Sequence, residues 1–102
     1  MFAAIYHWRI LPERDAEFRR AWRIRTQKIL DHCGSYGSHL WRGADGTYFS
    51  VALWPSREKW EAPMRLPSDA EDERAFRESI EQHLGTETME SVDDLWAIPN
   101  EL

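Results

Sequence analysis

The side chains best suited to chemistry in this chain are histidines and arginines that stand beside tryptophans on otherwise apolar faces of predicted strands and helices. These candidates are His7, Arg9, Trp22, Arg25, His32, His39, Trp41 and Trp54. A polar side chain on an apolar inward face costs about 1 to 3 kcal/mol unless it is paired or hydrated. An imidazole whose pKa lies near 6.5 can exchange a proton at neutral pH. Several such side chains in one small domain predict a partly hydrated cavity.

A structural role for the same side chains is the alternative interpretation. Arg25 and the histidines could pair with carboxylates near the end of the chain or with a partner subunit, and such pairs would leave no cavity. The carboxylates are Glu90, Asp93 and Asp94. The cavity interpretation requires Trp54, His7 and Arg25 to line one concave space of at least about 300 Å³, the low end for ligand pockets.

Length, composition and charge limit the classes of function. A chain of 102 residues predicts one domain, 1–102, and its single cysteine, Cys33, excludes an internal disulfide. The net charge is −5, and acidic residues are interleaved with the arginines of the first predicted helix, so nucleic-acid binding is not expected. No stretch has the length and apolarity of a membrane-spanning helix, so no membrane partner is expected. The N-terminal residues lack the pattern of a signal peptide, which predicts a cytoplasmic protein.

Motifs of the common catalytic and metal sites are missing from the sequence. There is no phosphate-binding loop, no GxSxG, no HExxH and no CxxC. The adjacent His32 and Cys33 would point about 100° apart on a helix, so they form neither a metal-ligand pair nor a nucleophile with its base. We therefore expect no metal site.

Hydrophobic periodicity predicts the elements that position the candidates in the first half of the chain. Alternation in period two indicates a strand over Phe2 to Ile10. A helix is expected from Leu11 to about Cys33, with proline in its first turn and glycine just past its end. Gly37 to Pro55 is typical of a hairpin whose tight turn is Gly43-Ala44-Asp45-Gly46.

Three further elements are expected after the hairpin, and they complete a fold. The first is a short helix from Arg57 to about Met64. The second is a helix from about Asp69 to His83, which opens with the capping box Ser68-Asp69-Ala70-Glu71 and is ended by Gly85. The third is a strand from Thr86 to Ile98, closed by Pro99. The order is βαββαβ, the α+β ferredoxin-like fold, with an antiparallel four-stranded sheet and helices on one face. Aromatic residues make up 13% of the chain, more than one small core can bury, so we expect a homodimer through the open sheet face.

Three stretches of the sequence resemble a known family. The third predicted strand ends in Trp54-Pro55-Ser56-Arg57-Glu58-Lys59-Trp60-Glu61, and it follows His32-Cys33-Gly34-Ser35-Tyr36-Gly37-Ser38 and Asp45-Gly46-Thr47-Tyr48. With the order of elements, these motifs resemble the antibiotic biosynthesis monooxygenase domain family of dimeric α+β barrels over nearly the whole chain. The resemblance implies a pocket in each subunit between sheet and helices, where cofactor-independent members oxygenate polycyclic phenols to quinones.

The resemblance also implies roles for individual residues. The family's tryptophan at the end of the third strand maps onto Trp54, and the catalytic asparagine of haem-degrading relatives falls on His7. Their haem-ligating histidine has no counterpart, because residues 57–66 contain no histidine, so haem degradation is not expected. His7 and Trp54 are therefore the predicted catalytic residues. The predicted substrate-binding residues are Trp22, Arg25, His39 and Trp41.

Two functions fit these expectations, and neither needs a cofactor. The first is a cofactor-independent monooxygenase in which His7 deprotonates a small planar phenolic substrate held against Trp54, after which the carbanion reduces O₂ directly. The second is a non-catalytic barrel that binds a small aromatic or apolar ligand in the same pocket without a productive base.

Overall fold

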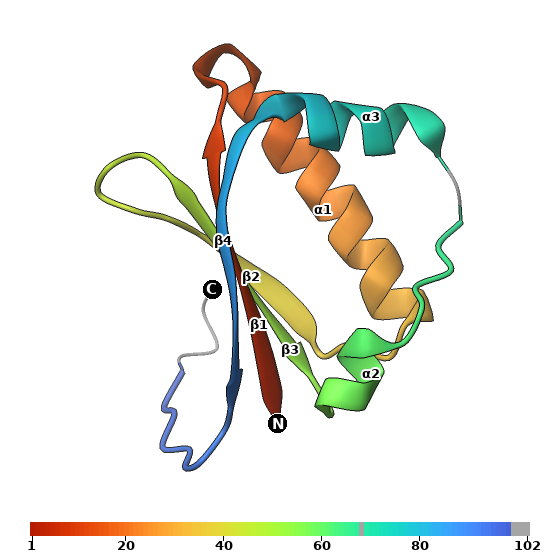
Figure 1. Ribbon diagram of the computed structural model, residues 1–102, viewed down its shortest axis with the longest axis vertical. Helices are drawn as coiled ribbons and strands as arrows, with labels where there is room; N and C mark the ends of the chain where they lie inside the picture. The colour runs from red at the N-terminus through yellow and green to blue at the C-terminus, as the bar shows by residue number, and fades with distance from the viewer. Residues whose placement is uncertain (68, 99–102) are drawn as a thin grey trace.

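The computed structural model of this chain describes residues 1–67 and 69–98, in which an antiparallel four-stranded sheet carries helices on one face (Figure 1). The elements are β1 (Phe2–Ile10), the 3₁₀ turn η1 (Pro12–Arg14), α1 (Asp15–His32), β2 (Gly37–Arg42), β3 (Tyr48–Trp54), α2 (Arg57–Glu61), α3 (Ala70–Ser79) and β4 (Ile80–Glu90). The strand order is β2-β3-β1-β4, and β1 pairs antiparallel with both β3 and β4. The predicted α+β ferredoxin-like fold is confirmed.

The central strand β1 follows the period of two that its sequence predicts. Phe2, Ala4, Trp8 and Ile10 are buried on the helix side of the sheet, which Tyr6 shares, and the odd-numbered residues between them face the other side. Phe18 of α1 is completely buried, and its ring meets Trp8 edge-on at 5.7 Å between ring centroids. This alternation therefore decides which side chains of β1 can line a site between the sheet and the helices.

The β2–β3 hairpin closes with the tight turn that the sequence predicts. Gly46 has a φ of +86°, in the left-handed region that glycine adopts without a steric penalty. Its amide donates to the Gly43 carbonyl at 3.0 Å, and the Gly43 amide donates to the Thr47 carbonyl at 2.7 Å. In the β1–β3 pairing that follows, Trp54 lies opposite Phe2 and shares its buried face.

The boundary between α3 and β4 is not where the sequence predicts it. The helix expected to reach His83 ends at Ser79, and the last strand covers Ile80–Glu90 instead of Thr86 to Ile98. The cause is tertiary, because Ile80–Glu90 pairs along β1 and the Leu11 amide donates to the Ser79 carbonyl at 3.0 Å. The unpaired amides and carbonyls at the edge of β1 stabilise an extended neighbour, and this outweighs a modest local helix propensity.

Smaller differences from the expectation surround α3. Gly85, expected to end this helix, lies inside β4, and α2 already ends at Glu61. Asp69 is the N-cap of α3, since its carboxylate accepts hydrogen bonds from two backbone amides of the first turn. Ser68, the first residue of the predicted capping box, and Pro99, expected to close the last strand, lie outside the described residues.

Apolar side chains are left uncovered on the side of the sheet away from the helices. Trp41 of β2 and Met89 of β4 are 53% and 50% exposed. In the segment after β4, Val92, Leu95 and Trp96 are more than three-quarters exposed, and this segment lies on the side of the sheet opposite α1 and α3 (Figure 1). Within residues 1–67 and 69–98, no helix has the length and apolarity needed to cross a membrane.

Candidate functional site

The sheet divides the predicted site residues into two groups, one on each face. The helix-side group is Trp22, Arg25 and Trp54, and the open-face group is His7, His39 and Trp41. Trp54 pairs with Phe2, which is buried under the helices, whereas His7 stands an odd number of residues from Phe2 on β1 and so points to the other face. Within the described part of the chain, His7 and Trp54 therefore do not line one cavity.

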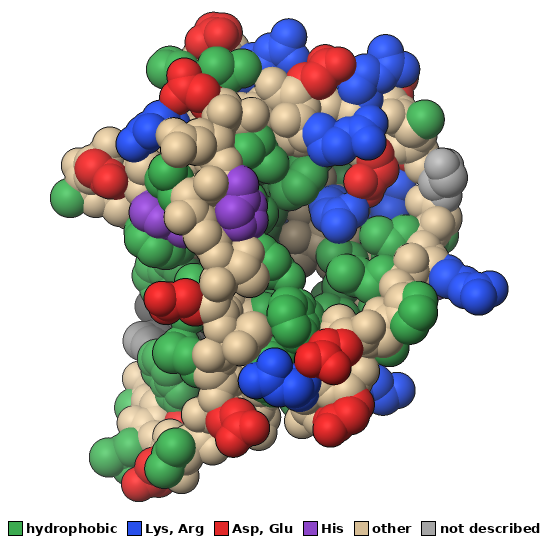
Figure 2. Space-filling model, in the orientation of Figure 1, with side chains coloured by type: hydrophobic (Ala, Val, Ile, Leu, Met, Phe, Trp, Pro, Cys, Tyr) green, Lys and Arg blue, Asp and Glu red, His purple; other side chains and the backbone are tan. Residues whose placement is uncertain are grey.

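A cavity of about 130 Å³ lies between the sheet and the helices α1 and α3. Figure 2 shows a hollow on this side of the molecule, bordered mainly by hydrophobic side chains. The largest side chains that line it are Tyr6, Trp8, Trp22, Trp54, Met64 and Phe76. The cavity is smaller than the expected minimum of about 300 Å³. A ligand larger than a single ring therefore requires wall side chains to move.

Trp54 lines this cavity and carries an unused hydrogen-bond donor. The residue is 2% exposed, and its Nε1 atom has no hydrogen-bond partner among the described residues. Neighbouring indoles are satisfied, because Trp22 Nε1 donates to Ser50 Oγ at 3.0 Å and Trp60 Nε1 donates to the Tyr6 hydroxyl at 2.9 Å. A buried N–H group without an acceptor costs about 1 to 3 kcal/mol. An acceptor atom of a ligand would remove that cost.

Arg25 brings positive charge to the wall of the cavity and is held there by α3. Its Nη1 atom donates to Glu73 Oε1 at 2.8 Å and to Oε2 at 3.0 Å, and its guanidinium lies 5.4 Å from the centre of the Phe76 ring. Both side chains of the ion pair are about one-third exposed, so the pair adds at most about 1 kcal/mol to stability. Arg25 thus has a carboxylate partner, supplied by α3 instead of the end of the chain.

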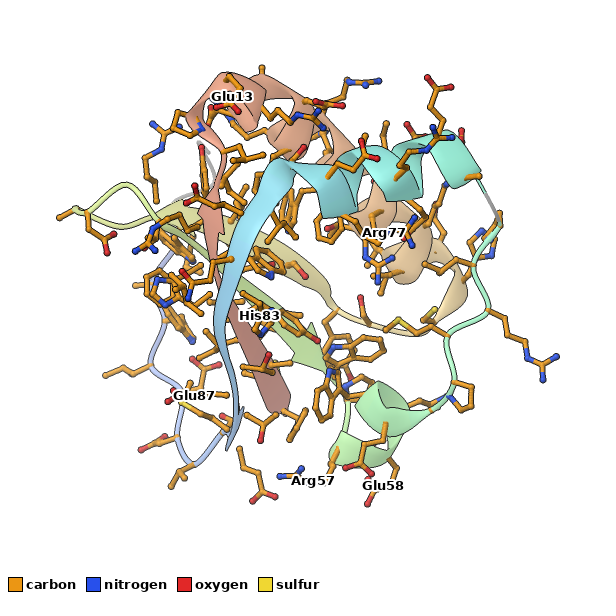
Figure 3. The ribbon with its side chains drawn as sticks, turned by 45° about the horizontal axis from the view of Figure 1, so that its top comes forward. Glu13, Arg57, Glu58, Arg77, His83 and Glu87 are labelled. Atoms are coloured by element: carbon orange, nitrogen blue, oxygen red, sulfur yellow. The ribbon has the colours of Figure 1, made fainter. Side chains whose placement is uncertain are left out.

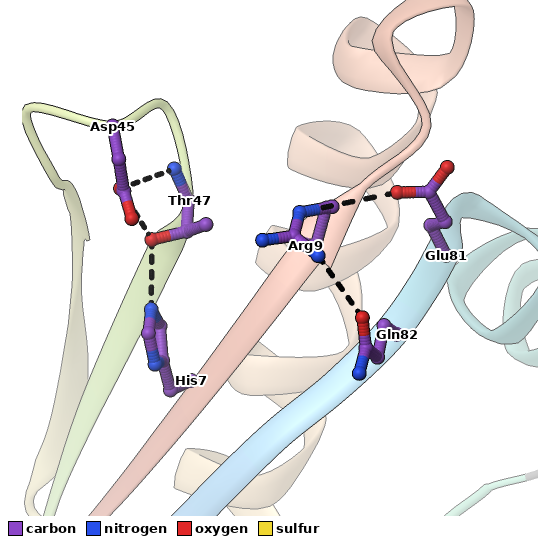
Figure 4. A network of polar contacts seen from close by, with 6 residues as sticks. All are labelled: His7, Arg9, Asp45, Thr47, Glu81 and Gln82. Carbon is purple, nitrogen blue, oxygen red and sulfur yellow. Dashed lines mark hydrogen bonds and ion pairs between the residues drawn. The ribbon is translucent and has the colours of Figure 1, made fainter.

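On the open face, His7 is held by a chain of hydrogen bonds (Figure 4). Asp45 Oδ1 accepts from the Thr47 hydroxyl at 2.7 Å and from the Thr47 amide at 3.0 Å, and these bonds hold the pKa of Asp45 below its ordinary value. His7 Nε2 lies 2.7 Å from Thr47 Oγ1. Because a carboxylate only accepts, the Thr47 hydroxyl donates its proton to Asp45, and His7 Nε2 must then donate to Thr47 Oγ1. In the neutral imidazole, Nδ1 is left as the acceptor. The His7 ring also stacks on Phe49 at 3.9 Å between centroids.

His39 and Trp41 form a second stacked pair on the same face. Their ring centroids are 3.9 Å apart and their planes are nearly parallel. Trp41 lies opposite Phe49 in the β2–β3 register, and Phe49 lies opposite His7 in the β1–β3 register. The open face therefore carries a row of flat rings that crosses three strands.

Two further polar candidates are paired with β4. Arg9 donates to Gln82 at 3.0 Å and lies 4.0 Å from Glu81 (Figure 4). His83, expected at the end of a helix, is placed on β4 (Figure 3). Its Nδ1 atom accepts from Trp8 Nε1 at 3.2 Å. These contacts explain both side chains without a ligand.

Sequence reasoning missed the hydroxyl-bearing residues that line the cavity, which are Tyr6, Thr26, Ser38 and Ser50. Tyr6, and not His7, is the polar side chain that β1 turns toward the helices, and its place on the Phe2 face was the available signal. Ser50 had no signal of its own, because its position follows from the register of β3 with β1. Together with Trp54, these hydroxyls are polar groups that a ligand in the cavity can meet.

Comparison with known families and structures agrees with the fold described above. A family model described as antibiotic biosynthesis monooxygenase matches residues 1–68. None of the curated proteins compared with this chain matches it.

Several solved structures share the fold. A Bordetella bronchiseptica protein assigned to the antibiotic biosynthesis monooxygenases is 18% identical, with 89% of this chain and 96% of that chain covered and a TM-score of 0.74. SnoaB, a cofactor-independent oxygenase from Streptomyces nogalater, is 14% identical, with 92% and 95% covered and a TM-score of 0.72. Rv0793 from Mycobacterium tuberculosis is 15% identical, with 91% and 96% covered and a TM-score of 0.71. At these identities the likeness concerns the fold alone.

Proposed function

This chain belongs to the antibiotic biosynthesis monooxygenase family, and from that premise we propose that it is a cofactor-independent monooxygenase acting on a small planar aromatic or phenolic substrate. The substrate would lie in the cavity between the sheet, α1 and α3, with Trp54 as the residue that meets its reacting oxygen. The shared fold with SnoaB, which is described as a cofactor-independent oxygenase, supports the proposal.

The observation that carries this proposal is the indole N–H of Trp54, which has no partner among the described residues and belongs to a cavity with aromatic walls. A phenol or ketone oxygen is the kind of acceptor that this donor lacks, and a planar ring fits between flat side chains. A hydrogen bond to an ionised oxygen favours the charged form and lowers the pKa of a bound phenol. The guanidinium of Arg25 acts in the same direction from the cavity wall, and its ion pair with Glu73 reduces this effect. Both groups therefore favour formation of the substrate anion.

The proposed reaction transfers electrons from the substrate anion to O₂ without a cofactor. When a ring CH₂ group becomes a carbonyl, one oxygen atom enters the substrate and the other leaves as water, so the four electrons removed from carbon reduce one O₂. In the cavity, the chain contributes binding, orientation and stabilisation of the anion. His7 lies on the other face of the sheet, so its action as a base would require a substrate on the open face beside His39 and Trp41.

Oxygen uptake with a panel of anthrone-like and quinol substrates tests the proposal. We expect uptake above the uncatalysed rate and a loss of about a hundredfold in kcat for Trp54→Phe, the scale measured for one donor to a developing oxyanion. Trp60→Phe is the matched control, because this indole donates to Tyr6. His7→Ala should leave the rate unchanged, and a loss of turnover there would move the reaction to the open face. The absence of uptake with every substrate would reject the enzyme proposal.

A non-catalytic ligand-binding role is the second candidate, and one observation favours it. Among the described residues that line the cavity there is no histidine, aspartate or glutamate, so no side chain of the kind that usually accepts a proton faces a ligand there. In this case an aromatic ligand would bind and quench tryptophan fluorescence with no consumption of oxygen. Parallel measurement of quenching and oxygen uptake distinguishes the two functions.

We also propose that two copies of the chain associate through the open sheet face. The side chains that β1 and β3 turn to this face include Ile5, Val51 and Leu53, all partly exposed, and the neighbouring Trp41 and Met89 are about half exposed. A contiguous apolar sheet face on a small domain is costly in water, and a second copy presents a matching face. Sedimentation equilibrium should show a dimer at micromolar concentration, and a monomer would contradict the interface.

A further inference from the structure

A second and larger hollow shares the side chain of Trp22 with the cavity. It is a groove of about 590 Å³ between α1 and the β2–β3 hairpin, within the range of about 300 to 1,000 Å³ that is typical of ligand sites. Four arginines line it, and they are Arg19, Arg20 and Arg23 of α1 and Arg42 of β2. The chain as a whole has a net charge of −5, so this positive charge is a local feature.

Most of that positive charge is not neutralised. Asp15 is the carboxylate that contacts the groove arginines, and it lies 3.5 Å from Arg42 and 3.8 Å from Arg19. Among the described residues, Arg20 and Arg23 make no ion pair. The carboxylate of Asp15 therefore contacts two guanidiniums, while the guanidiniums of Arg20 and Arg23 remain available to an anion. Guanidinium groups bind carboxylates with two parallel hydrogen bonds, which makes them well suited to such a ligand.

The indole of Trp22 lines both hollows. It faces the cavity of about 130 Å³ and the groove of about 590 Å³. The polar contact that holds its ring is the hydrogen bond from Nε1 to Ser50 Oγ at 3.0 Å. Movement of the Trp22 side chain would join the aromatic cavity to the wider basic groove. The joined space would accommodate the planar ligand for which the cavity alone is too small.

From this juxtaposition we propose that the cavity and the groove are two halves of one ligand site and that the ligand is a planar aromatic carboxylate. Its ring and hydroxyl or keto oxygen lie in the cavity near Trp54, and its carboxylate lies in the groove between Arg20 and Arg23. The proposal rests on the proposed function and adds the charge of the substrate to it. The hydrogen bond lost when Trp22 moves is offset by charge-assisted hydrogen bonds from the guanidiniums.

Calorimetric titration with two probes tests the proposal without requiring turnover. The probes are a hydroxynaphthoate with its hydroxyl and carboxylate at opposite ends of the ring system, and the matching neutral carboxamide. At about 0.01 M salt we expect the carboxylate to bind about tenfold more tightly, and at about 1 M salt, where the Debye length falls to about 3 Å, most of the preference should vanish. Arg23→Gln should weaken carboxylate binding about fivefold, the upper range for one exposed ion pair, and leave carboxamide binding unchanged.

The control variant removes the same charge elsewhere. Arg77 is an exposed residue of α3 that does not line the groove (Figure 3), so Arg77→Gln should preserve the preference for the carboxylate. Equal binding of the two probes to the unmodified protein, or equal effects of Arg23→Gln and Arg77→Gln, would overturn the two-part site and leave the proposed function standing. Failure of both probes to bind at any salt concentration would overturn the proposed cavity ligand and this inference with it.

Discussion

Replacement of Trp54 by phenylalanine separates a ligand-binding role from a structural one. The indole Nε1 is buried and has no partner in the described part of the chain, so Trp54→Phe removes a desolvated donor and thereby stabilises the folded protein by about 1 to 3 kcal/mol. The smaller ring leaves roughly 40 Å³ empty, which at about 24 cal/mol per Å³ costs about 1 kcal/mol, in addition to the lost burial of the removed atoms. These opposing contributions nearly cancel. We therefore expect the free energy of unfolding to change by less than about 1 kcal/mol.

The same substitution should weaken ligand binding. A ligand oxygen would lose one hydrogen bond, worth about 0.5 to 1.5 kcal/mol for a neutral acceptor and about 1.5 to 3 kcal/mol for a phenolate. The dissociation constant should rise about tenfold, and more above the pKa of the phenol. Binding is measured by calorimetry with a planar phenol, and stability by urea unfolding at one fixed protein concentration, because association of copies would make stability concentration-dependent.

Trp60→Phe provides the comparison for both measurements. Trp60 Nε1 donates to the Tyr6 hydroxyl at 2.9 Å, so this variant loses a formed hydrogen bond as well as ring volume. It should lose about 2 kcal/mol of stability, with a smaller effect on binding. The reasoning would be refuted if Trp54→Phe destabilised the protein as much as Trp60→Phe and left the dissociation constant unchanged, since Trp54 would then be only a packing residue.

Three further outcomes follow from the polar networks. Thr47→Val removes the acceptor for His7 Nε2, so nitrogen NMR should show the Nε2–H tautomer in the unmodified protein and a mixture in the variant. The pKa of Asp45 is lowered in the folded protein, chiefly by the Thr47 hydroxyl. The ionised carboxylate therefore stabilises the fold above about pH 4, and this stabilisation is lost as the pH falls through the pKa of Asp45 in the folded protein. Asp45→Asn should flatten this acid dependence in urea unfolding. Burial raises the pKa of Tyr48. The stabilisation by its protonated hydroxyl is therefore present below about pH 10 and is lost as the pH rises through the pKa of Tyr48 in the folded protein. Tyr48→Phe should reduce this alkaline loss of stability in the same assay.

The sequence by itself determined the elements whose signal is local. The alternation over Phe2–Ile10 predicts β1 because a strand turns successive side chains to opposite faces, and the structure has this strand with the same bounds. The hairpin follows from Asp45-Gly46, since glycine supplies the positive φ of the turn. The order βαββαβ of all the predicted elements was sufficient to predict the α+β fold.

The tertiary structure decided where long-range pairing competes with local preference. Residues 80–83 continue an amphipathic helical pattern in the sequence, yet they extend because the edge of β1 offers them hydrogen bonds. The end of α3 and the bounds of β4 therefore could not be obtained from local propensity.

The composition of the site was decided in the same way. Whether His7 and Trp54 share a face depends on the parity of the β1–β3 register, and the pairing of Trp54 with Phe2 places them on opposite faces. The inward stripe of the first predicted helix made Trp22 and Arg25 candidates, and the family resemblance made Trp54 one. Their meeting with Tyr6 and Ser50 in one cavity depends on how α1 packs across the sheet, and no local pattern carries that information.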